Sequence, residues 1–120
     1  MKIAVSAEGP DVSSPVDPRF GRAAYFIIYD LDQNTFESLP NADNAGATQG
    51  AGIQAAQLVA RHSVDLVVSG NMGPKAFEAL RAAGIKIVAW NEGTVAEAVE
   101  LIRSGRFQSL DGASVKSHWA

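Results

Sequence analysis

Hydrophobic positions divide this chain into short apolar runs and longer stretches with helical spacing. KIAVSA at 2–7 predicts a buried strand that begins almost at the first residue. AAYFIIYDL at 23–31 is rich in aromatic and β-branched residues, and TFESL at 35–39 alternates apolar and polar positions. With a DQN turn between them, these two segments predict a hairpin. VDLVVS at 64–69 and IKIVAW at 85–90 are near-continuous apolar runs, as buried parallel strands require.

Three stretches have the spacing of helices packed on a sheet. The first covers residues 50–62, where apolar positions are dense on one side. The second covers 74–84, with a proline suited to the first helical position and a glycine suited to the C-terminal cap. In the third, Thr94 and Glu97 have capping-box spacing, and Gly105 ends the apolar stripe.

The predicted order is therefore βββαβαβα, an α/β fold with helices on both faces of a mostly parallel sheet. If the strands at 2–7, 64–69 and 85–90 run parallel, their carboxyl ends deliver three loops to one edge. These loops are residues 8–22, 70–74 and 91–93. Open α/β sheets bind ligands at that edge.

The chain length fits one domain, residues 1–120, with a core fold in 1–104 and a C-terminal tail in 105–120. PNADNAGATQ at 40–49 contains no large apolar residue, which predicts a mobile surface loop. The tail from Phe107 onward has no clear period, and we expect it to be loosely packed.

Charge and residue content exclude several classes of function. The formal net charge is −3, whereas nucleic-acid binders usually need a basic face, so any anion site must be local. The chain has no cysteine, which excludes disulfides, thiolate-ligated zinc and cysteine nucleophiles. No signal sequence or membrane-length apolar run is present in this sequence, and we expect a cytoplasmic protein.

The second loop, SGNMGPKAF at 69–77, is a glycine-bracketed turn that leads directly into a helix start. Gly70 and Gly73 allow close backbone approach to a ligand, the first helical amides point outward, and Lys75 adds positive charge. Such a turn attracts anions, although it lacks the spacing of a P-loop or a dinucleotide fingerprint. A plain turn before a proline-started helix is the alternative interpretation.

The first loop carries Arg19 and Arg22 on either side of a Phe-Gly pair. These arginines either bind an anion or are solvated and paired with Asp11 or Asp17. Their convergence with the second loop favours the anion. Phe20 and Met72 are either plain packing side chains or an apolar wall of the site. In the second case, Met72 adds a polarizable sulfur to the wall.

Nothing in the sequence predicts catalysis. His62 ends a helix and His118 lies in the tail, with no partner histidine at ligand spacing. No Ser-His-Asp arrangement, HExxH motif or close carboxylate pair can be argued, and we expect a binding protein rather than an enzyme. Trp90 ends a strand and either borders the site or packs at the rim of the core.

Three segments together resemble the dinitrogenase iron-molybdenum cofactor biosynthesis family over about residues 1–104. They are SPVDPRFGRAAYF at 14–26, GAGIQAAQLV at 50–59 and VDLVVSGNMGPKAFEALRAAGIKIV at 64–88. Their order, spacing and loop residues agree with the family pattern. The resemblance implies a ribonuclease H-like, three-layer α/β/α fold with a five-stranded mixed sheet. It also implies a role in binding, carrying or storing metal-sulfur clusters or their precursors.

Cysteine-free, single-domain members of this length imply a more specific cargo, a non-covalently held molybdenum-copper sulfide cluster in which two thiomolybdate units enclose a copper ion. Such a cluster brings its own sulfide ligands. The protein must then supply positive charge, amide donors and an apolar surface that slows hydrolysis. The resemblance thus implies a cofactor-binding site without a direct side-chain metal ligand, made of Arg19, Phe20, Gly21, Arg22, Asn71, Met72, Gly73, Pro74 and Lys75.

The sequence thus leads to the hypothesis of a carrier or assembly scaffold for an anionic metal-sulfide cluster. We expect partner proteins in cluster delivery, and neither nucleic acid nor a membrane as partner. Two alternatives stay open. One is a small-molecule module that binds phosphate or a nucleotide, and the other is an adaptor whose loops dock on a partner protein.

Overall fold

The computed structural model describes residues 1–42 and 50–110, and it has the predicted element order. The strands are β1 (Lys2–Ala7), β2 (Tyr25–Asp30), β3 (Thr35–Pro40), β4 (Leu66–Ser69) and β5 (Lys86–Ala89). The helices are α2 (Ala51–Ala60), α3 (Pro74–Ala82) and α4 (Val95–Ser104). Predicted and observed bounds differ only at the ends of the elements.

The five strands form one mixed sheet in the order β3-β2-β1-β4-β5. β1 pairs antiparallel with β2 and parallel with β4, and β4 pairs parallel with β5. β2 and β3 form the predicted hairpin. The predicted α/β fold with a five-stranded mixed sheet is therefore confirmed, and three parallel strands end at one edge.

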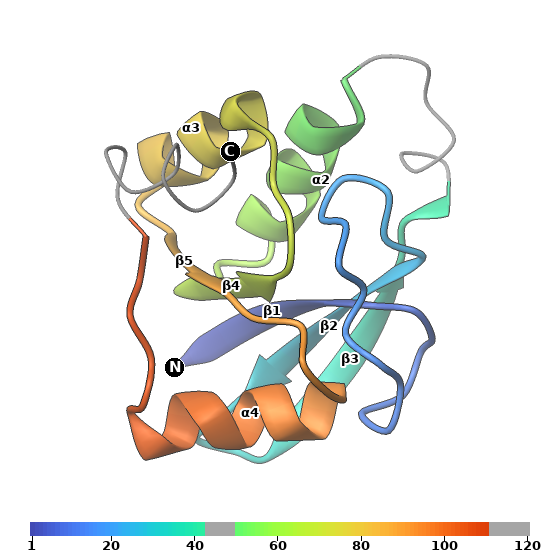
Figure 1. Cartoon of the computed structure of the whole chain (residues 1–120), viewed down its shortest axis with the longest axis vertical. Coiled ribbons are helices and arrows are strands. Elements are labelled where there is room, and N and C mark those ends of the chain that lie inside the picture. The colour runs from blue at the N-terminus through green and yellow to red at the C-terminus, as the bar shows by residue number, and fades with distance from the viewer. Residues whose placement is uncertain (43–49, 111–120) are drawn as a thin grey trace.

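Helices cover both faces of the sheet (Figure 1): α2 and α3 lie on one face and α4 on the other. Alternate residues of each inner strand enter separate cores. Val67 packs with α2 and α3, whereas Leu66 and Val68 pack with α4. All three side chains are fully buried. This explains why the inner strands are almost continuously apolar, since neither face is exposed to water.

Local signals fix the ends of α4. The Thr94 hydroxyl accepts a hydrogen bond from the Glu97 amide at 3.2 Å, and the Glu97 carboxylate accepts one from the Thr94 amide at 3.0 Å. The predicted capping box is therefore confirmed. Gly105 follows with φ of 71°, a left-handed conformation that glycine adopts without steric cost.

The first residues after α4 pack against the body of the protein. Phe107 is half-buried against the core on the α4 face, and Leu110 against the core on the opposite face. The Leu110 amide donates to the Ile87 carbonyl oxygen at 2.7 Å. The start of the tail is therefore more ordered than its sequence indicated. The predictions for 43–49 and 111–120, including His118, fall outside the described residues.

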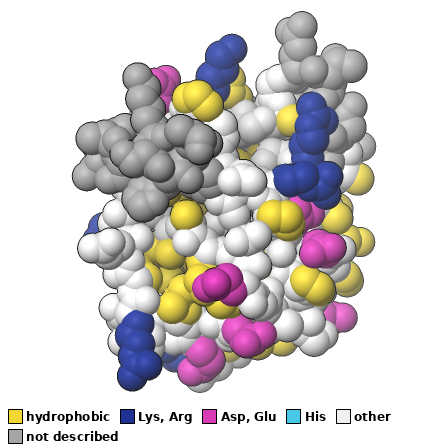
Figure 2. Space-filling model, viewed as in Figure 1, with side chains coloured by type: hydrophobic (Ala, Val, Ile, Leu, Met, Phe, Trp, Pro, Cys, Tyr) yellow, Lys and Arg dark blue, Asp and Glu magenta, His cyan; other side chains and the backbone are white. Residues whose placement is uncertain are grey.

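The visible surface has no continuous basic patch. Figure 2 shows lysine and arginine side chains on this face as separate groups, with acidic side chains between some of them. The described helices have nine or ten residues each, and none of them has the length and apolar character needed to cross a membrane. An anion site would have to be built locally rather than by bulk charge.

Replacing the cap of α4 tests the importance of this local signal. Thr94→Ala removes the acceptor for the Glu97 amide and should lower the free energy of unfolding by about 1 kcal/mol, measured by urea denaturation. Ser13→Ala, which removes a hydroxyl from an exposed loop position, should change it by less than about 0.5 kcal/mol. Equal effects of the two substitutions would contradict a role for the cap.

Candidate anion-binding site

The first and second loops are joined by backbone hydrogen bonds beyond the end of β4. The Phe20 amide donates to the Asn71 carbonyl oxygen at 3.0 Å, and the Asn71 amide donates to the Pro18 carbonyl oxygen. Arg19 and Asn71 thereby form an isolated parallel bridge outside the strands of the sheet. The two loops predicted to carry the site are thus in direct contact.

Gly70 permits this contact because no side chain fits there. A Cβ atom on Gly70 would lie 2.6 Å from the Pro18 carbonyl oxygen and 2.7 Å from its Cα atom. Both are backbone atoms, which cannot rotate away. Gly70 therefore permits the close approach of two chain segments, which the sequence pattern did not predict.

A buried polar group fixes the base of the first loop. Ser6 and Ser69, at the ends of β1 and β4, are 0% and 1% exposed. The Ser6 hydroxyl donates to the Asp17 carbonyl oxygen at 2.7 Å and lies 2.8 Å from the Ser69 hydroxyl. The Asp17 amide in turn donates to the Ser6 carbonyl oxygen at 2.8 Å. Buried polar atoms that bind one another in this way hold the loop in one position.

Arg19 is paired within the protein. Its Nε atom lies 3.2 Å from Oδ1 of Asp17 and its second terminal nitrogen 3.3 Å from Oδ2, while its backbone amide also donates to Oδ1 at 2.9 Å. The Asp17 side chain is buried, whereas that of Arg19 is 63% exposed. The hydrogen bond to Asp17, followed by the charge of Asp17, raises the pKa of the Arg19 guanidinium above its ordinary value. The predicted pairing with Asp17 is therefore observed, and anion binding by the exposed Arg19 side chain stays a prediction.

All nine residues predicted for the site lie together. Eight line a depression of about 430 Å³ between the two loops. A second depression of about 660 Å³ shares Gly21, Arg22, Gly73 and Pro74 with the first, and it contains Lys75. No acidic side chain lines either depression among the described residues.

Phe20 and Met72 form the floor of the first depression. They are 1% and 4% exposed, and the Phe20 ring packs against Phe26 with centroids 5.1 Å apart. Both residues line the depression, so their part in an apolar wall of the site stays a prediction, although they are buried packing side chains as well. Their main role is in the core, because both belong to the cluster beneath α2 and α3.

Two helices direct their N-termini to the second depression, which is lined by the N-cap residue and first three residues of α2 (50–53) and of α3 (73–76). Neither helix has a side-chain cap or an acidic residue in its first turn. The start of α4 differs, because the capping box and the carbonyl groups of Val12 and Ser14 occupy its first amides. The first turns of α2 and α3 therefore offer amide donors and positive partial charge.

Sequence reasoning missed the contribution of α2. A Cβ atom on Gly21 would lie 2.8 Å from the Gly52 amide nitrogen, so the first loop lies directly on the first turn of this helix. A Cβ atom on Gly52 would lie 3.1 Å from the Ala76 Cβ atom of α3. The spacing of Gly21 and Gly52 carries no motif. Gly21 was among the predicted site residues, whereas Gly52 lies in GAGIQAAQLV at 50–59, a segment of the family resemblance that was not assigned to the site.

Asn41 was also missed, because it was assigned to an exposed loop. It is 1% exposed, and its side-chain amide donates to the carbonyl oxygens of Gly21 at 3.2 Å and Ala23 at 2.9 Å. Its backbone amide donates to the Ala24 carbonyl oxygen at 2.9 Å. The prediction of surface exposure is wrong here, and Asn41 positions the backbone next to Arg22.

Three other sequence candidates lie away from the two depressions. The loop at 91–93 is bound to the first loop through the Val16 amide, which donates to the Gly93 carbonyl oxygen at 2.9 Å, and it lines neither depression. His62 lies at the end of α2, where its Nδ1 atom is 2.9 Å from the Leu58 carbonyl oxygen. Trp90 packs with the core on the α4 face. These residues are therefore not part of the candidate site.

Comparison with known proteins identifies the family. A family model described as dinitrogenase iron-molybdenum cofactor matches residues 1–105. The chain belongs to this family. The structure of the apo form of the orange protein from Desulfovibrio gigas is similar, with a TM-score of 0.90 and 42% identity over 92% of this chain and 93% of that one.

Two further relatives show how far the similarity extends. The structure of a putative NifB protein from Thermotoga has a TM-score of 0.80 and 37% identity, over 91% of this chain and 92% of the other. An uncharacterised protein from Methanocaldococcus jannaschii is 26% identical over 113 residues, 92% of each chain. The family and the likeness to the orange protein support binding or carriage of a metal cluster.

Two glycines in the second loop provide a matched test of its geometry. Gly70→Ala should lower the free energy of unfolding by about 1–3 kcal/mol, because the added Cβ collides with Pro18. Gly73→Ala places its Cβ in open space at φ of −68°, and it should leave stability unchanged or raise it by up to about 1 kcal/mol. Thermal and urea unfolding of both variants measure the difference. A stable Gly70→Ala protein would show that the loops need not approach this closely.

Proposed function

We propose that this protein binds and carries an anionic metal-sulfide cluster, in the most specific form a copper ion enclosed by two thiomolybdate units. The observation that supports this most is the convergence of two helix N-termini without acidic residues around Arg22 and Lys75. Amide donors and cations in one open depression suit a compact polyanion.

The residues present fit a cargo that supplies its own metal ligands. The chain has no cysteine, and the described residues contain no group of three or more His, Asp or Glu side chains placed to hold a metal ion. Sulfide ions in a thiomolybdate already complete the coordination of molybdenum and copper. The protein then binds the outer surface of the cluster through hydrogen bonds and charge, not through bonds to the metal.

Positive charge for this role is unequally distributed among the three predicted cations. Arg19 forms an ion pair with Asp17, and we assign to Arg19 mainly the role of holding the first loop in place. Arg22 lines both depressions and Lys75 lies at the first turn of α3. Because both of these side chains line the depression that the two helix N-termini surround, we assign to them the larger share of the attraction for the cluster.

The buried floor beneath the depression supports a carrier rather than an enzyme. Phe20 and Met72 close the lower side with apolar atoms, which limits the access of water to a bound cluster. The described residues leave the upper side open. A compact ligand could enter and leave without movement of the core, as transfer of a cargo requires.

Reconstitution of the cluster tests the proposal directly. Adding tetrathiomolybdate and a copper salt to the protein should give visible charge-transfer bands that co-elute with it. The variant Arg22→Ala/Lys75→Ala should retain the fold and bind the chromophore about tenfold or more weakly, because hydrogen bonds to charged groups are lost. Adding Arg19→Ala should weaken binding further by a smaller factor.

The matched control is Arg61→Ala/Arg81→Ala, which removes the same charge from exposed positions outside both depressions. This variant should bind the chromophore like the unmodified protein. Equal chromophore formation by the triple variant and the unmodified protein would refute the site. Tighter binding of phosphate or a nucleotide than of thiomolybdate in equilibrium dialysis would refute the cargo and favour a small-molecule module.

A further inference from the structure

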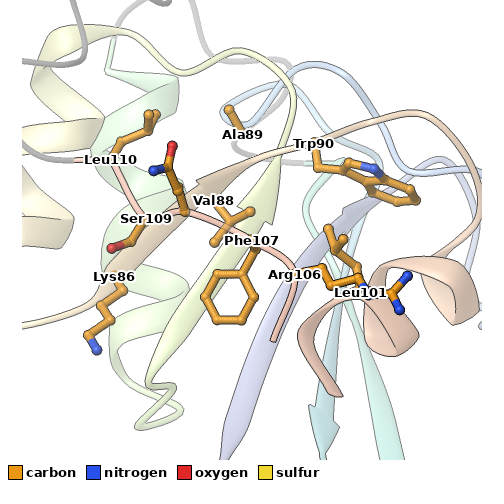
Figure 3. Close-up of a pocket in the computed structure, with 10 residues that line it drawn as sticks. Lys86, Val88, Ala89, Trp90, Leu101, Arg106, Phe107, Ser109 and Leu110 are labelled. Carbon is orange, nitrogen blue, oxygen red and sulfur yellow. The ribbon is translucent and has the colours of Figure 1, made fainter. Parts of the chain in front are cut away.

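A larger depression lies beside β5, the terminal strand of the sheet. Its volume is about 710 Å³, and it lies between β5, α4 and the segment that follows α4. In Figure 3, Phe107 stands between β5 and α4, with Lys86 and Arg106 on either side of its ring. None of the residues that line this depression belongs to the candidate anion-binding site.

The wall formed by β5 is a strand edge with backbone groups directed outward. β5 is the terminal strand of the sheet, and it pairs with β4 on one side. The Trp90 amide donates to the Ser69 carbonyl oxygen, so the amide and carbonyl of Ala89 face away from β4 in the parallel ladder. An edge of this kind can pair with another extended segment.

The outer edge of β5 already pairs with one residue of the segment that follows α4. The Leu110 amide donates to the Ile87 carbonyl oxygen at 2.7 Å, and the two residues form an antiparallel bridge. Toward α4 the segment diverges from β5, and no further bridge between the two forms among the described residues. Within residues 1–42 and 50–110, the outward groups of Ala89 therefore face the depression rather than another strand.

The side chains around the depression combine apolar surface with positive charge. Trp90, Leu101 and Phe107 are partly buried and supply the apolar part. Lys86 and Arg106 are exposed, and neither has an ion-pair partner among the described residues. No acidic side chain of the described part of the chain lines the depression. In a protein with a net charge of −3, this local cationic character points to an acidic ligand.

We propose that this depression is a docking site for an extended acidic segment of a partner protein, which adds to the outer edge of β5. The partner's backbone would pair with the amide and carbonyl of Ala89. Its acidic side chains would contact Lys86 and Arg106, and its apolar side chains would cover Trp90 and Phe107. This mode of recognition combines main-chain hydrogen bonds with side-chain selection at alternate positions.

The strand edge favours a peptide over a small anion. A free phosphate or carboxylate would be expected at converging amide donors, whereas this depression presents one outward amide and one outward carbonyl beside apolar side chains. Its place away from the two helix N-termini also allows a partner to bind while the other site is occupied. The inference does not depend on the proposed cargo, and its test needs none.

The probe is a capped synthetic peptide that alternates glutamate with valine, and its counterpart has lysine in place of glutamate. Each is titrated into the full-length, ¹⁵N-labelled protein while amide chemical shifts are followed. The acidic peptide should shift the amides of residues 87–90 and 106–110, and those of Gly21 and Ala51 should stay unchanged. The basic peptide should bind at least about tenfold more weakly.

Two variants separate charge from strand pairing. Lys86→Glu/Arg106→Glu should weaken binding of the acidic peptide by about tenfold or more, whereas the control Arg61→Glu/Arg81→Glu should change it by no more than about twofold. Ala89→Pro removes the outward amide, a change that edge strands tolerate, and it should weaken binding by about fivefold or more. Thermal unfolding confirms that each variant is folded. Arg106→Ala serves as a milder substitute if the double variant does not fold.

Several results would overturn the proposal. Shifts confined to the anion-binding site would show that the peptide binds only as a polyanion. Equal binding of free glutamate or inorganic phosphate at residues 87–90 would indicate a small-anion site. Concentration-dependent shifts of these residues without peptide would indicate that a second copy of the chain covers the edge. Unchanged spectra with both peptides would exclude this mode of docking.

Discussion

The contact between Pro18 and Gly70 is the constraint on which the candidate site depends. It brings a loop that follows β1 against a loop that follows β4, and it works only because residue 70 has no side chain. The buried hydroxyl groups of Ser6 and Ser69 hold the strand ends below it. Once the first loop lies here, Gly21 reaches the start of α2 and Arg22 lies between two helix N-termini.

This arrangement explains how an acidic protein can attract an anion. Acidic side chains are absent from the described lining of both depressions, and the first turns of α2 and α3 contain none. The start of α4 carries Glu97 and is closed by the first loop. The first loop thus occupies the first amides of α4, whereas α2 and α3 begin without a side-chain cap in the part of the chain that the structure describes. Partial charges of the backbone then act over a few ångströms, where the net charge of the protein has little influence.

The carboxyl edge of the parallel strands and the outer edge of β5 present different surfaces. At the carboxyl edge, close packing of glycines and buried polar groups gives a fixed surface suited to a compact ligand. Along β5, a single bridge to Leu110 leaves part of the strand edge facing a depression lined by apolar and cationic side chains. A compact anion and an extended segment therefore need not compete for the same surface.

The sequence by itself determined the fold and the family. Apolar runs, turn residues and the capping box at Thr94 are local signals. Short-range sterics and hydrogen bonding decide which secondary structure each of them forms. The sequence also predicted that the nine residues of the candidate site lie together, because parallel strands deliver their following loops to one edge. Tertiary structure alone decided that Arg19 pairs with Asp17, that Phe20 and Asn41 are buried, and that α2 joins the site. These features depend on which distant segments of the chain come into contact. Such contacts produce no periodic pattern of apolar and polar residues from which they could be predicted.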